Sequence, residues 1–163
     1  MSAFADKVVI VTGSSSGIGE STALEFAKQG AKVTLCGRNE DALKRVAEEV
    51  KNLSNCEPVQ IVGDIAEESV QDEIINQTIA KFGQLDILVN NAGLGNSADA
   101  IDNPQLMQAF DTICAVNARA PLRLIQLAVP HLEKTKGNVV NISSIGSTYP
   151  VSIEGVQLLY IFY

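Results

Sequence analysis

Short apolar runs and longer periodic segments alternate along the chain from residue 7 to residue 142. The short runs are rich in β-branched residues and lack polar alternation, which predicts strands buried on both faces of a sheet. The longer segments repeat apolar residues at helical spacing and predict amphipathic helices. The expected strands span residues 7–12, 32–36, 59–62, 86–89 and 138–142. The expected helices span residues 17–29, 40–52, 67–81 and 104–132, the last being one long helix or two.

This alternation predicts a parallel sheet with helices on both faces, an α/β doubly wound fold. Apolar side chains at helical spacing mark the helix faces that are expected to pack on the sheet. They are Ala23, Leu24, Phe26 and Ala27 in the first helix, Leu43, Val46, Ala47 and Val50 in the second, and Val70, Ile74, Ile75 and Ile79 in the third. The fourth segment carries Leu106, Phe110, Ile113, Val116, Leu122, Ile125 and Val129.

A loop of Gly and Ser follows the first expected strand and leads into the first expected helix. Gly13, Gly17 and Gly19 allow a sharp turn and leave no side chain between the backbone and a ligand. The helix would aim its free N–H groups and the positive end of its dipole at this loop, an arrangement that receives a phosphate or pyrophosphate. No Gly-Lys-Ser/Thr follows, so a P-loop nucleoside triphosphatase is not indicated. Alone, the loop is equally compatible with a Gly-rich turn that binds nothing.

Polar residues in a characteristic order follow the later strands. Together with the loop TGSSSGIG at 12–19, these are Asp64, NNAG at 90–93, Asn117 and NISS at 141–144. In sequence and spacing they closely resemble the short-chain dehydrogenase/reductase family, from about residue 5 to about residue 150. The resemblance implies a Rossmann-like sheet of order 3-2-1-4-5 with the fifth strand at an edge, in a dinucleotide-binding domain over residues 1–152. It also implies hydride transfer on a small-molecule carbonyl or alcohol substrate, in a family that is usually homo-oligomeric.

The resemblance further implies a set of cofactor-binding residues. They are Gly13, Ser15, Ser16, Gly17, Ile18, Gly19, Arg38, Asn39, Asp64, Ile65, Asn91, Ala92 and Gly93. In the family, the residue matching Asp64 accepts a hydrogen bond from the adenine amino group, and the segment matching 90–93 lies along the cofactor and locks the central sheet. From the residues alone, Asp64 could instead be a helix cap or loop carboxylate, and Asn-Asn-Ala-Gly a plain turn.

Asn117 and Ser144 are the expected catalytic residues on the same ground. In the family, the residue matching Asn117 bends the helix and holds a water chain for proton relay, and the one matching Ser144 hydrogen-bonds the substrate carbonyl. A buried Asn must find partners, so Asn117 could equally bond a neighbouring backbone. Ser144 could equally be an ordinary hydroxyl at a strand end.

The end of the second expected strand favours NADP over NAD. A carboxylate there would bond both ribose hydroxyls of NAD, but Gly37 stands at that place and Arg38 follows it. A 2′-phosphate would meet no anion and one fork-shaped cation. NAD remains possible because Ser16 stands where many NADP-using members carry a second basic residue, and because Glu40 and Asp41 are near in sequence. Arg38 could also be a solvated surface arginine.

The Tyr-x-x-x-Lys pair of the family is absent from the chain. Its place, counted from Ser144, holds Gln157, and no Lys follows Lys136. We therefore expect a truncated chain, with family-like sequence to residue 152, a divergent apolar tail at 153–163 and no ordinary turnover. The alternatives are a short isoform that binds a dinucleotide without catalysis and a fragment that does not fold stably.

Composition narrows the remaining classes of protein. The chain has 163 residues, 46% of them hydrophobic, which is about one domain with a substantial core. Its formal net charge of −7 argues against a nucleic-acid or anionic-membrane partner. Cys36, Cys56 and Cys114 are far apart and lack metal-ligand spacing, so we expect reduced core thiols, no metal site and a cytoplasmic protein. No apolar run is long enough to span a membrane, and the first strand begins too early for a targeting segment.

Overall fold

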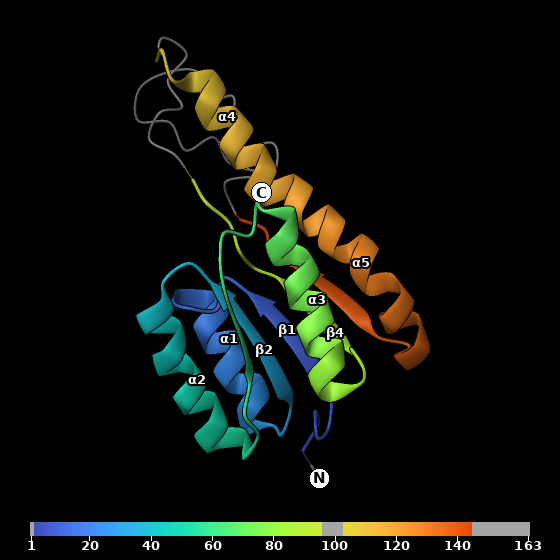
Figure 1. Ribbon diagram of the computed structural model, residues 1–163. Helices are drawn as coiled ribbons and strands as arrows, with labels where there is room; N and C mark the ends of the chain where they lie inside the picture. Colours follow the sequence, from blue (N-terminus) through green and yellow to red (C-terminus); the bar gives the residue numbers. More distant parts are fainter. Residues whose placement is uncertain (1, 96–102, 145–163) are drawn as a thin grey trace.

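The computed structural model describes residues 2–95 and 103–144, which form a five-stranded parallel sheet covered by helices (Figure 1). The strands are β1 (Val8–Thr12), β2 (Lys32–Gly37), β3 (Val59–Val62), β4 (Ile87–Asn90) and β5 (Asn138–Asn141). Their order is β3-β2-β1-β4-β5. The predicted order is therefore confirmed, and β5 lies at an edge of the sheet in the described part of the chain. The expected tail at 153–163 and the place of the Tyr-x-x-x-Lys pair lie outside the described residues.

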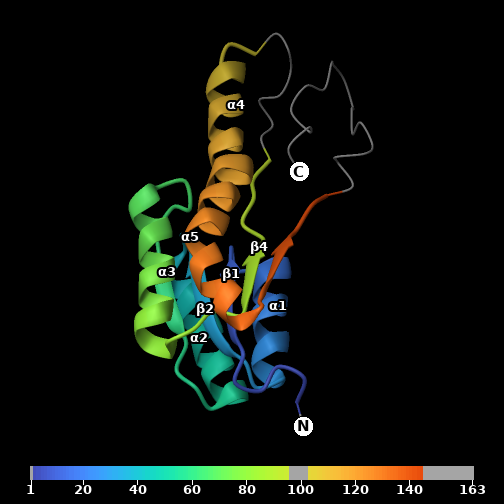
Figure 2. The same ribbon diagram turned by 90° about the vertical axis from the view of Figure 1, so that its right-hand side faces the viewer.

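Helices cover both faces of the sheet (Figures 1 and 2). The first face carries α1 (Gly17–Lys28) and α2 (Glu40–Ser54), and the second carries α3 (Glu68–Phe82) and α5 (Ala120–Thr135). Alternate side chains of β1 enter the two cores, with Val9 and Val11 in the first and Val8 and Ile10 in the second. All four are fully buried, each at a gain of about 1.5–3 kcal/mol. Burial on both sides explains why this strand is apolar without alternation.

The predicted inner faces of the first three helices are largely confirmed. Ala23 and Ala27 of α1 are buried, while Leu24 and Phe26 are half-buried at the margin of the core. Every predicted inner residue of α2 is buried, and so are those of α3 except the half-buried Ile79.

The long segment expected at 104–132 folds into three consecutive helical pieces. They are α4 (Leu106–Cys114), the π-helical turn η1 (Ala115–Arg119) and α5. The backbone passes from one to the next without leaving helical geometry, and α5 ends at Thr135 because Lys136 adopts a left-handed conformation. Apolar character does not by itself mark the buried face of this segment, since Val116 is buried but Leu122 is 69% exposed.

Asp86 ties the start of β4 to the start of β1. Its carboxylate accepts hydrogen bonds from Val8 N at 2.9 Å, from Lys7 Nζ at 2.8 Å and from Gln84 Nε2 at 2.8 Å. Burial alone would raise the pKa of Asp86, but these hydrogen bonds outweigh that effect and hold the pKa below its ordinary value. The register between the two strands is thus fixed at their amino ends.

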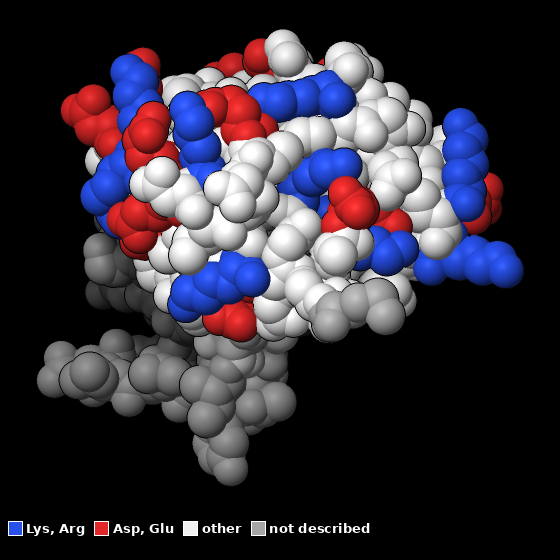
Figure 3. All heavy atoms as spheres, turned by 90° about the horizontal axis from the view of Figure 1, so that it is seen from below, with Lys and Arg blue, Asp and Glu red and all other residues white. Residues whose placement is uncertain are grey.

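Charges of both signs are interspersed on the face seen from below in Figure 3. The described part of that face therefore presents no continuous basic or acidic surface. No helix within residues 2–95 and 103–144 is both long and apolar enough to cross a membrane.

Candidate functional site

A cavity of about 350 Å³ lies at the carboxyl ends of the four strands β1 to β4. In an open parallel sheet, this is the edge at which ligands bind. The loops after β1 and β3, the end of β2, and the segment after β4 form its walls. The lining residues are Gly13, Ser15, Ser16, Ile18, Cys36, Gly37, Arg38, Gly63, Asp64, Ile65, Asn91, Ala92, Gly93, Leu94 and Val116.

The loop between β1 and α1 is clamped on both sides. Gly13 has a φ of +66°, and a Cβ at this position would lie 2.9 Å from Ala92 Cα, so the turn requires glycine. On the other side, Ser14 N and Ser14 Oγ donate to Cys36 O at 3.0 and 3.3 Å. Ser14 Oγ also accepts from Cys36 N at 2.9 Å. The loop therefore has a fixed position between β2 and the segment after β4.

The amino end of α1 lies at this cavity. Ser16 is the N-cap residue, with extended backbone, and its side chain makes no capping hydrogen bond. Ser15, Ser16 and Ile18 all line the cavity. An uncapped helix start, with its free N–H groups and positive dipole end, is suited to a phosphate group.

Thr12 joins the ends of β1 and β4 through one buried hydroxyl group. Its Oγ1 atom accepts hydrogen bonds from Asn91 N at 3.0 Å and Ala92 N at 2.9 Å, and donates to Val89 O at 3.4 Å. In return, Asn91 Nδ2 donates to Thr12 O at 2.9 Å and to Gly13 O at 3.3 Å. The segment after β4 is thereby held against the Gly/Ser loop.

Thr12→Val is expected to lower the free energy of unfolding by about 2 kcal/mol, because two backbone N–H groups lose their acceptor while the shape of the side chain is kept. Urea denaturation followed by circular dichroism measures this change. Thr12→Ser keeps the oxygen atom and is the matched control, with an expected loss of less than half as much. A loss in Thr12→Val no larger than that in Thr12→Ser would contradict the prediction, because Thr12→Val loses only the hydroxyl and Thr12→Ser only the methyl group.

Asp64 and Ile65 form the wall contributed by the loop after β3. Asp64 Oδ1 accepts from Ala66 N at 2.9 Å, and Asp64 O accepts from Glu67 N at 3.0 Å. One carboxylate oxygen thus fixes the loop, as the structural alternative for this residue predicted. A carboxylate accepts several hydrogen bonds, so Asp64 retains acceptor capacity at the cavity.

Arg38 and Asn39 follow each other at the end of β2, but only Arg38 lines the cavity. Arg38 is exposed and lines the cavity, and no ion pair links it to another described residue. Asn39 is instead the N-cap of α2, where Asn39 Oδ1 accepts from Ala42 N at 3.0 Å, and it does not line the cavity. Gly37 packs closely on Ser15, since a Cβ at Gly37 would lie 2.9 Å from Ser15 Oγ.

Cys36 is a core residue at the base of this cavity. Burial, and then the negative charges of Asp64 and Glu73, raise the pKa of its thiol to about 12. The thiol is therefore neutral at physiological pH, and the prediction of a core filler is confirmed for this cysteine.

A second cavity of about 600 Å³ brings Asn117 and Ser144 together. It shares residues 91–94 and Ile18 with the first cavity. Asn117 lies in η1, and its amide pairs twice with Leu94: its Oδ1 accepts from Leu94 N and its Nδ2 donates to Leu94 O, both at 2.9 Å. The backbone hydrogen bonding that was one alternative for Asn117 is therefore present, and it holds the segment shared by the two cavities. Ser144 is exposed just after β5.

All the expected cofactor-binding residues except Gly17, Gly19 and Asn39 line the first cavity. Gly17 and Gly19 belong to the first turn of α1, where Gly19 is buried against the loop. The clamps made by Thr12 and Ser14 were not predicted from the sequence, and neither was Val116 as a lining residue. A Thr directly before the Gly/Ser loop was a visible signal for the first clamp, whereas Val116 looks like any apolar helix residue. Among the described residues, no group of three or more His, Cys, Asp or Glu side chains could hold a metal ion.

Comparisons with known proteins agree with this architecture. A family model described as short chain dehydrogenase matches residues 7–156. The 11-beta-hydroxysteroid dehydrogenase-like 2 protein of Arabidopsis thaliana is 39% identical over 150 residues, which cover 92% of this chain and 48% of that protein. A crystal structure of a short-chain dehydrogenase/reductase of unknown function from Caenorhabditis elegans, with cofactor, has a TM-score of 0.84 and 34% identity, covering 98% of this chain and 59% of that one.

A further structural match is an alcohol dehydrogenase from the archaeon Thermococcus sibiricus, complexed with 5-hydroxy-NADP. It has a TM-score of 0.83 and 26% identity, and the match covers 95% of this chain and 64% of that one. The chain spans about half the length of the curated relatives that it matches first.

Proposed function

Because the chain belongs to the short-chain dehydrogenase family, we propose that its first cavity holds a nicotinamide dinucleotide, with NADP preferred over NAD. The observation that carries the proposal is the start of α1, which has no side-chain cap and lies at a cavity at the carboxyl ends of the strands. A pyrophosphate has the charge and the acceptor atoms that such a helix start binds.

The residues present fit this group. A Cβ at Gly19 would overlap Gly13 O and lie 2.5 Å from Asn91 Nδ2, so glycine alone lets the first turn of α1 approach the loop. Asp64 supplies an acceptor for the adenine amino group, and Ile65 supplies an apolar surface beside it. Gly93 has no side chain and Ala92 only a methyl group, so the backbone after β4 can lie close along the cofactor. The remaining members of the proposed cofactor set are Ser15, Ser16, Gly17, Ile18, Arg38 and Asn91.

The preference for NADP rests on the rim of the cavity at the end of β2. Gly37 offers no carboxylate to the ribose hydroxyls, and Arg38 presents an exposed guanidinium without an ion-pair partner among the described residues. A guanidinium binds a phosphate through two parallel hydrogen bonds. The complex of the Thermococcus alcohol dehydrogenase with 5-hydroxy-NADP shows that a family relative of similar fold binds this cofactor type.

Replacing Arg38 tests the proposal by calorimetric titration with NADP and NAD. We expect Arg38→Gln to weaken NADP binding by about 10–100-fold, the value of one charge-assisted contact, and to leave NAD binding within about twofold. Arg45→Gln, which removes an exposed guanidinium on α2 outside the cavity, is the matched control and should leave the ratio of the two affinities unchanged. Wild-type binding of NAD as tight as that of NADP would contradict the preference, and no binding of either would contradict the site.

The second cavity is the proposed place of the chemistry. Bound nicotinamide supplies or accepts a hydride, and the substrate class is a small-molecule alcohol or carbonyl compound. Ser144 is proposed to hydrogen-bond the substrate oxygen. Asn117 is proposed to shape the helix at η1 and, through Leu94, to keep residues 91–94 in place beside both cavities. A polypeptide of these 163 residues, which contain no Tyr-x-x-x-Lys, is proposed to bind the cofactor without turning over.

A further inference from the structure

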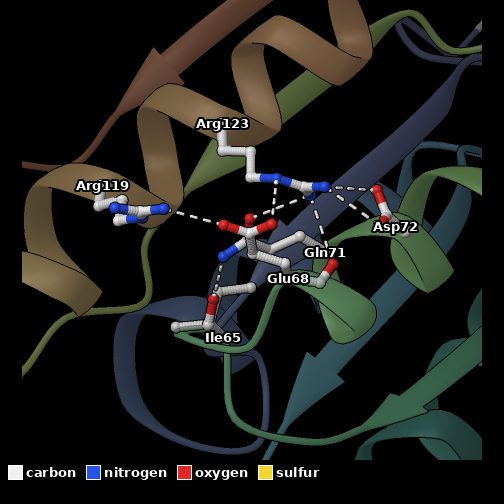
Figure 4. A network of polar contacts seen from close by, with 6 residues as sticks. All are labelled: Ile65, Glu68, Gln71, Asp72, Arg119 and Arg123. Carbon is white, nitrogen blue, oxygen red and sulfur yellow. Dashed lines mark hydrogen bonds and ion pairs between the residues drawn. The ribbon is translucent and has the colours of Figure 1, made fainter.

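A buried polar network lies behind the wall formed by Asp64 and Ile65 (Figure 4). Gln71 of α3 is 1% exposed, and its Nε2 atom donates a 2.7 Å hydrogen bond to Ile65 O. Ile65 lines the cavity and is itself buried. The amide of Gln71 therefore touches the backbone of the wall from the side that a ligand does not reach.

Arg123 of α5 holds Gln71 from the other side. Its Nη1 atom donates to Gln71 Oε1 and to Glu68 O, both at 3.3 Å. Its Nη2 atom donates to both carboxylate oxygens of Asp72, at 2.9 and 3.2 Å. Arg119 adds an exposed contact to Glu68 at 2.9 Å. One half-buried guanidinium thus fixes the first turns of α3, and Figure 4 shows its fork directed at all three α3 residues.

A buried Gln is costly unless both ends of its amide are paired. In this network the Oε1 atom is paired by Arg123 and the Nε2 atom by Ile65 O, so the amide can occupy only one orientation. Two further hydrogen bonds, from Ala66 N and Glu67 N, run back to Asp64 within the loop, and Gly63 N donates to Gly37 O of β2. The side chain of Gln71 adds a hydrogen bond from the buried face of α3 to the backbone of Ile65.

We propose that Gln71 is a positioning residue for the adenine end of the dinucleotide, and that Arg123 acts through it. The proposal rests on the proposed dinucleotide function. Gln71 fixes the position of Ile65 and the orientation of the Asp64 carboxylate before a ligand binds. Less conformational entropy is therefore lost when the ligand binds. It does not touch the nicotinamide end, whose walls come from residues 91–94 and η1.

Two substitutions of Gln71 differ in whether they keep the hydrogen bond to Arg123. Gln71→Leu removes both hydrogen bonds, while Gln71→Glu keeps an acceptor for Arg123 and loses the donor to Ile65 O. Thr78→Val is the matched control, because Thr78 is a fully buried polar residue of the same helix that bonds Thr34 and Ile74 O, away from the cavity. A merely structural role predicts similar behaviour for all three variants.

The test measures binding of adenosine diphosphate and of nicotinamide mononucleotide by NMR titration, together with amide hydrogen exchange of Ala66 and Glu67. Both Gln71 variants should bind adenosine diphosphate about tenfold more weakly, the factor produced by about 1.4 kcal/mol, and should bind nicotinamide mononucleotide as the wild type does. The two amides should exchange about tenfold faster in both Gln71 variants and at the wild-type rate in Thr78→Val.

Unchanged exchange of Ala66 and Glu67 in Gln71→Leu would overturn the positioning role, whatever the ligand data show. So would an equal loss of adenosine diphosphate affinity in Thr78→Val. If the wild-type chain binds neither NADP nor NAD, the proposed function fails instead, and the exchange rates still decide whether Gln71 fixes the loop.

Discussion

A polypeptide of these 163 residues is expected to bind NADP and yet to interconvert simple alcohols and carbonyl compounds at least about a thousandfold more slowly than a full-length family member. Hydride transfer must be matched by movement of a proton at the substrate oxygen. The family resemblance assigns that proton to a Tyr whose pKa is lowered by a Lys, and the chain contains no such pair. An unassisted tyrosine has a pKa near 10, so ionising it at pH 7 costs about three pKa units, or roughly 4 kcal/mol. Ser144 and Asn117 can orient an oxygen atom, but neither side chain ionises near neutral pH.

The measurement follows NADPH absorbance with a panel of small aldehydes and ketones, and NADP reduction with the corresponding alcohols. Calorimetric binding of NADP by the same preparation is the internal control, because it shows that the absence of turnover does not come from an unfolded chain. A full-length family member assayed alongside supplies the reference rate. Turnover at a rate comparable with that reference would refute the expectation and would require a proton donor that the resemblance does not identify.

The strands were the most predictable part of the fold. Val8 to Val11 are buried on both sides, and a strand in that position can only be an uninterrupted apolar run. The same physical constraint makes β2 and β4 recognisable, and the alternation with helices then restricts the topology to a parallel sheet. The order of the strands depended on the family resemblance, because nothing in the local sequence of β3 or β5 says which neighbour each pairs with.

The helical segment after residue 104 shows where periodicity stops being informative. An α-helix and a π-helical turn have similar local sequences, so the change at η1 was visible only as an Asn among apolar residues. The extra residue in a π turn shifts the following helix face relative to the preceding one. Leu122 is 69% exposed while Val116 is buried, so the apolar residues of this segment do not all mark its buried face.

The walls of the cavity were predictable, and the contacts that hold them were not. The family resemblance grouped Asp64, Asn91 and the Gly/Ser loop, and the structure brings them together because the carboxyl ends of parallel strands meet at one edge of the sheet. Asn39 was grouped with them by its position in the sequence. Its side chain instead caps the amino end of α2, where Asn39 Oδ1 accepts a hydrogen bond from Ala42 N. The contact between Gln71 and Arg123 could not be predicted from the sequence, because it forms only when α3 and α5 pack together.

Gly19→Ala is expected to weaken NADP binding by at least about a hundredfold and to lower the free energy of unfolding by about 3 kcal/mol. The added Cβ would overlap Gly13 O and lie 2.5 Å from Asn91 Nδ2 and 2.8 Å from Gly13 C. Two of these three atoms are backbone atoms of a loop that Ser14 clamps to β2, so the loop cannot yield locally. Relief requires α1 to move away from the loop, which separates the helix N–H groups from the position where the phosphates are proposed to bind. Calorimetric titration and urea denaturation measure the two effects.

Gly83→Ala is the matched control for the general cost of replacing glycine. Gly83 ends α3 with a φ of +77°, and no atom lies within 4 Å of a Cβ placed there, so this variant carries backbone strain without a steric clash. It should lose about 1–2 kcal/mol of stability and bind NADP as the wild type does, since Gly83 does not line the cavity. The comparison separates a lost site from a weakened fold: if Gly19→Ala retained wild-type affinity, the close approach of α1 to the loop would not be what forms the phosphate site.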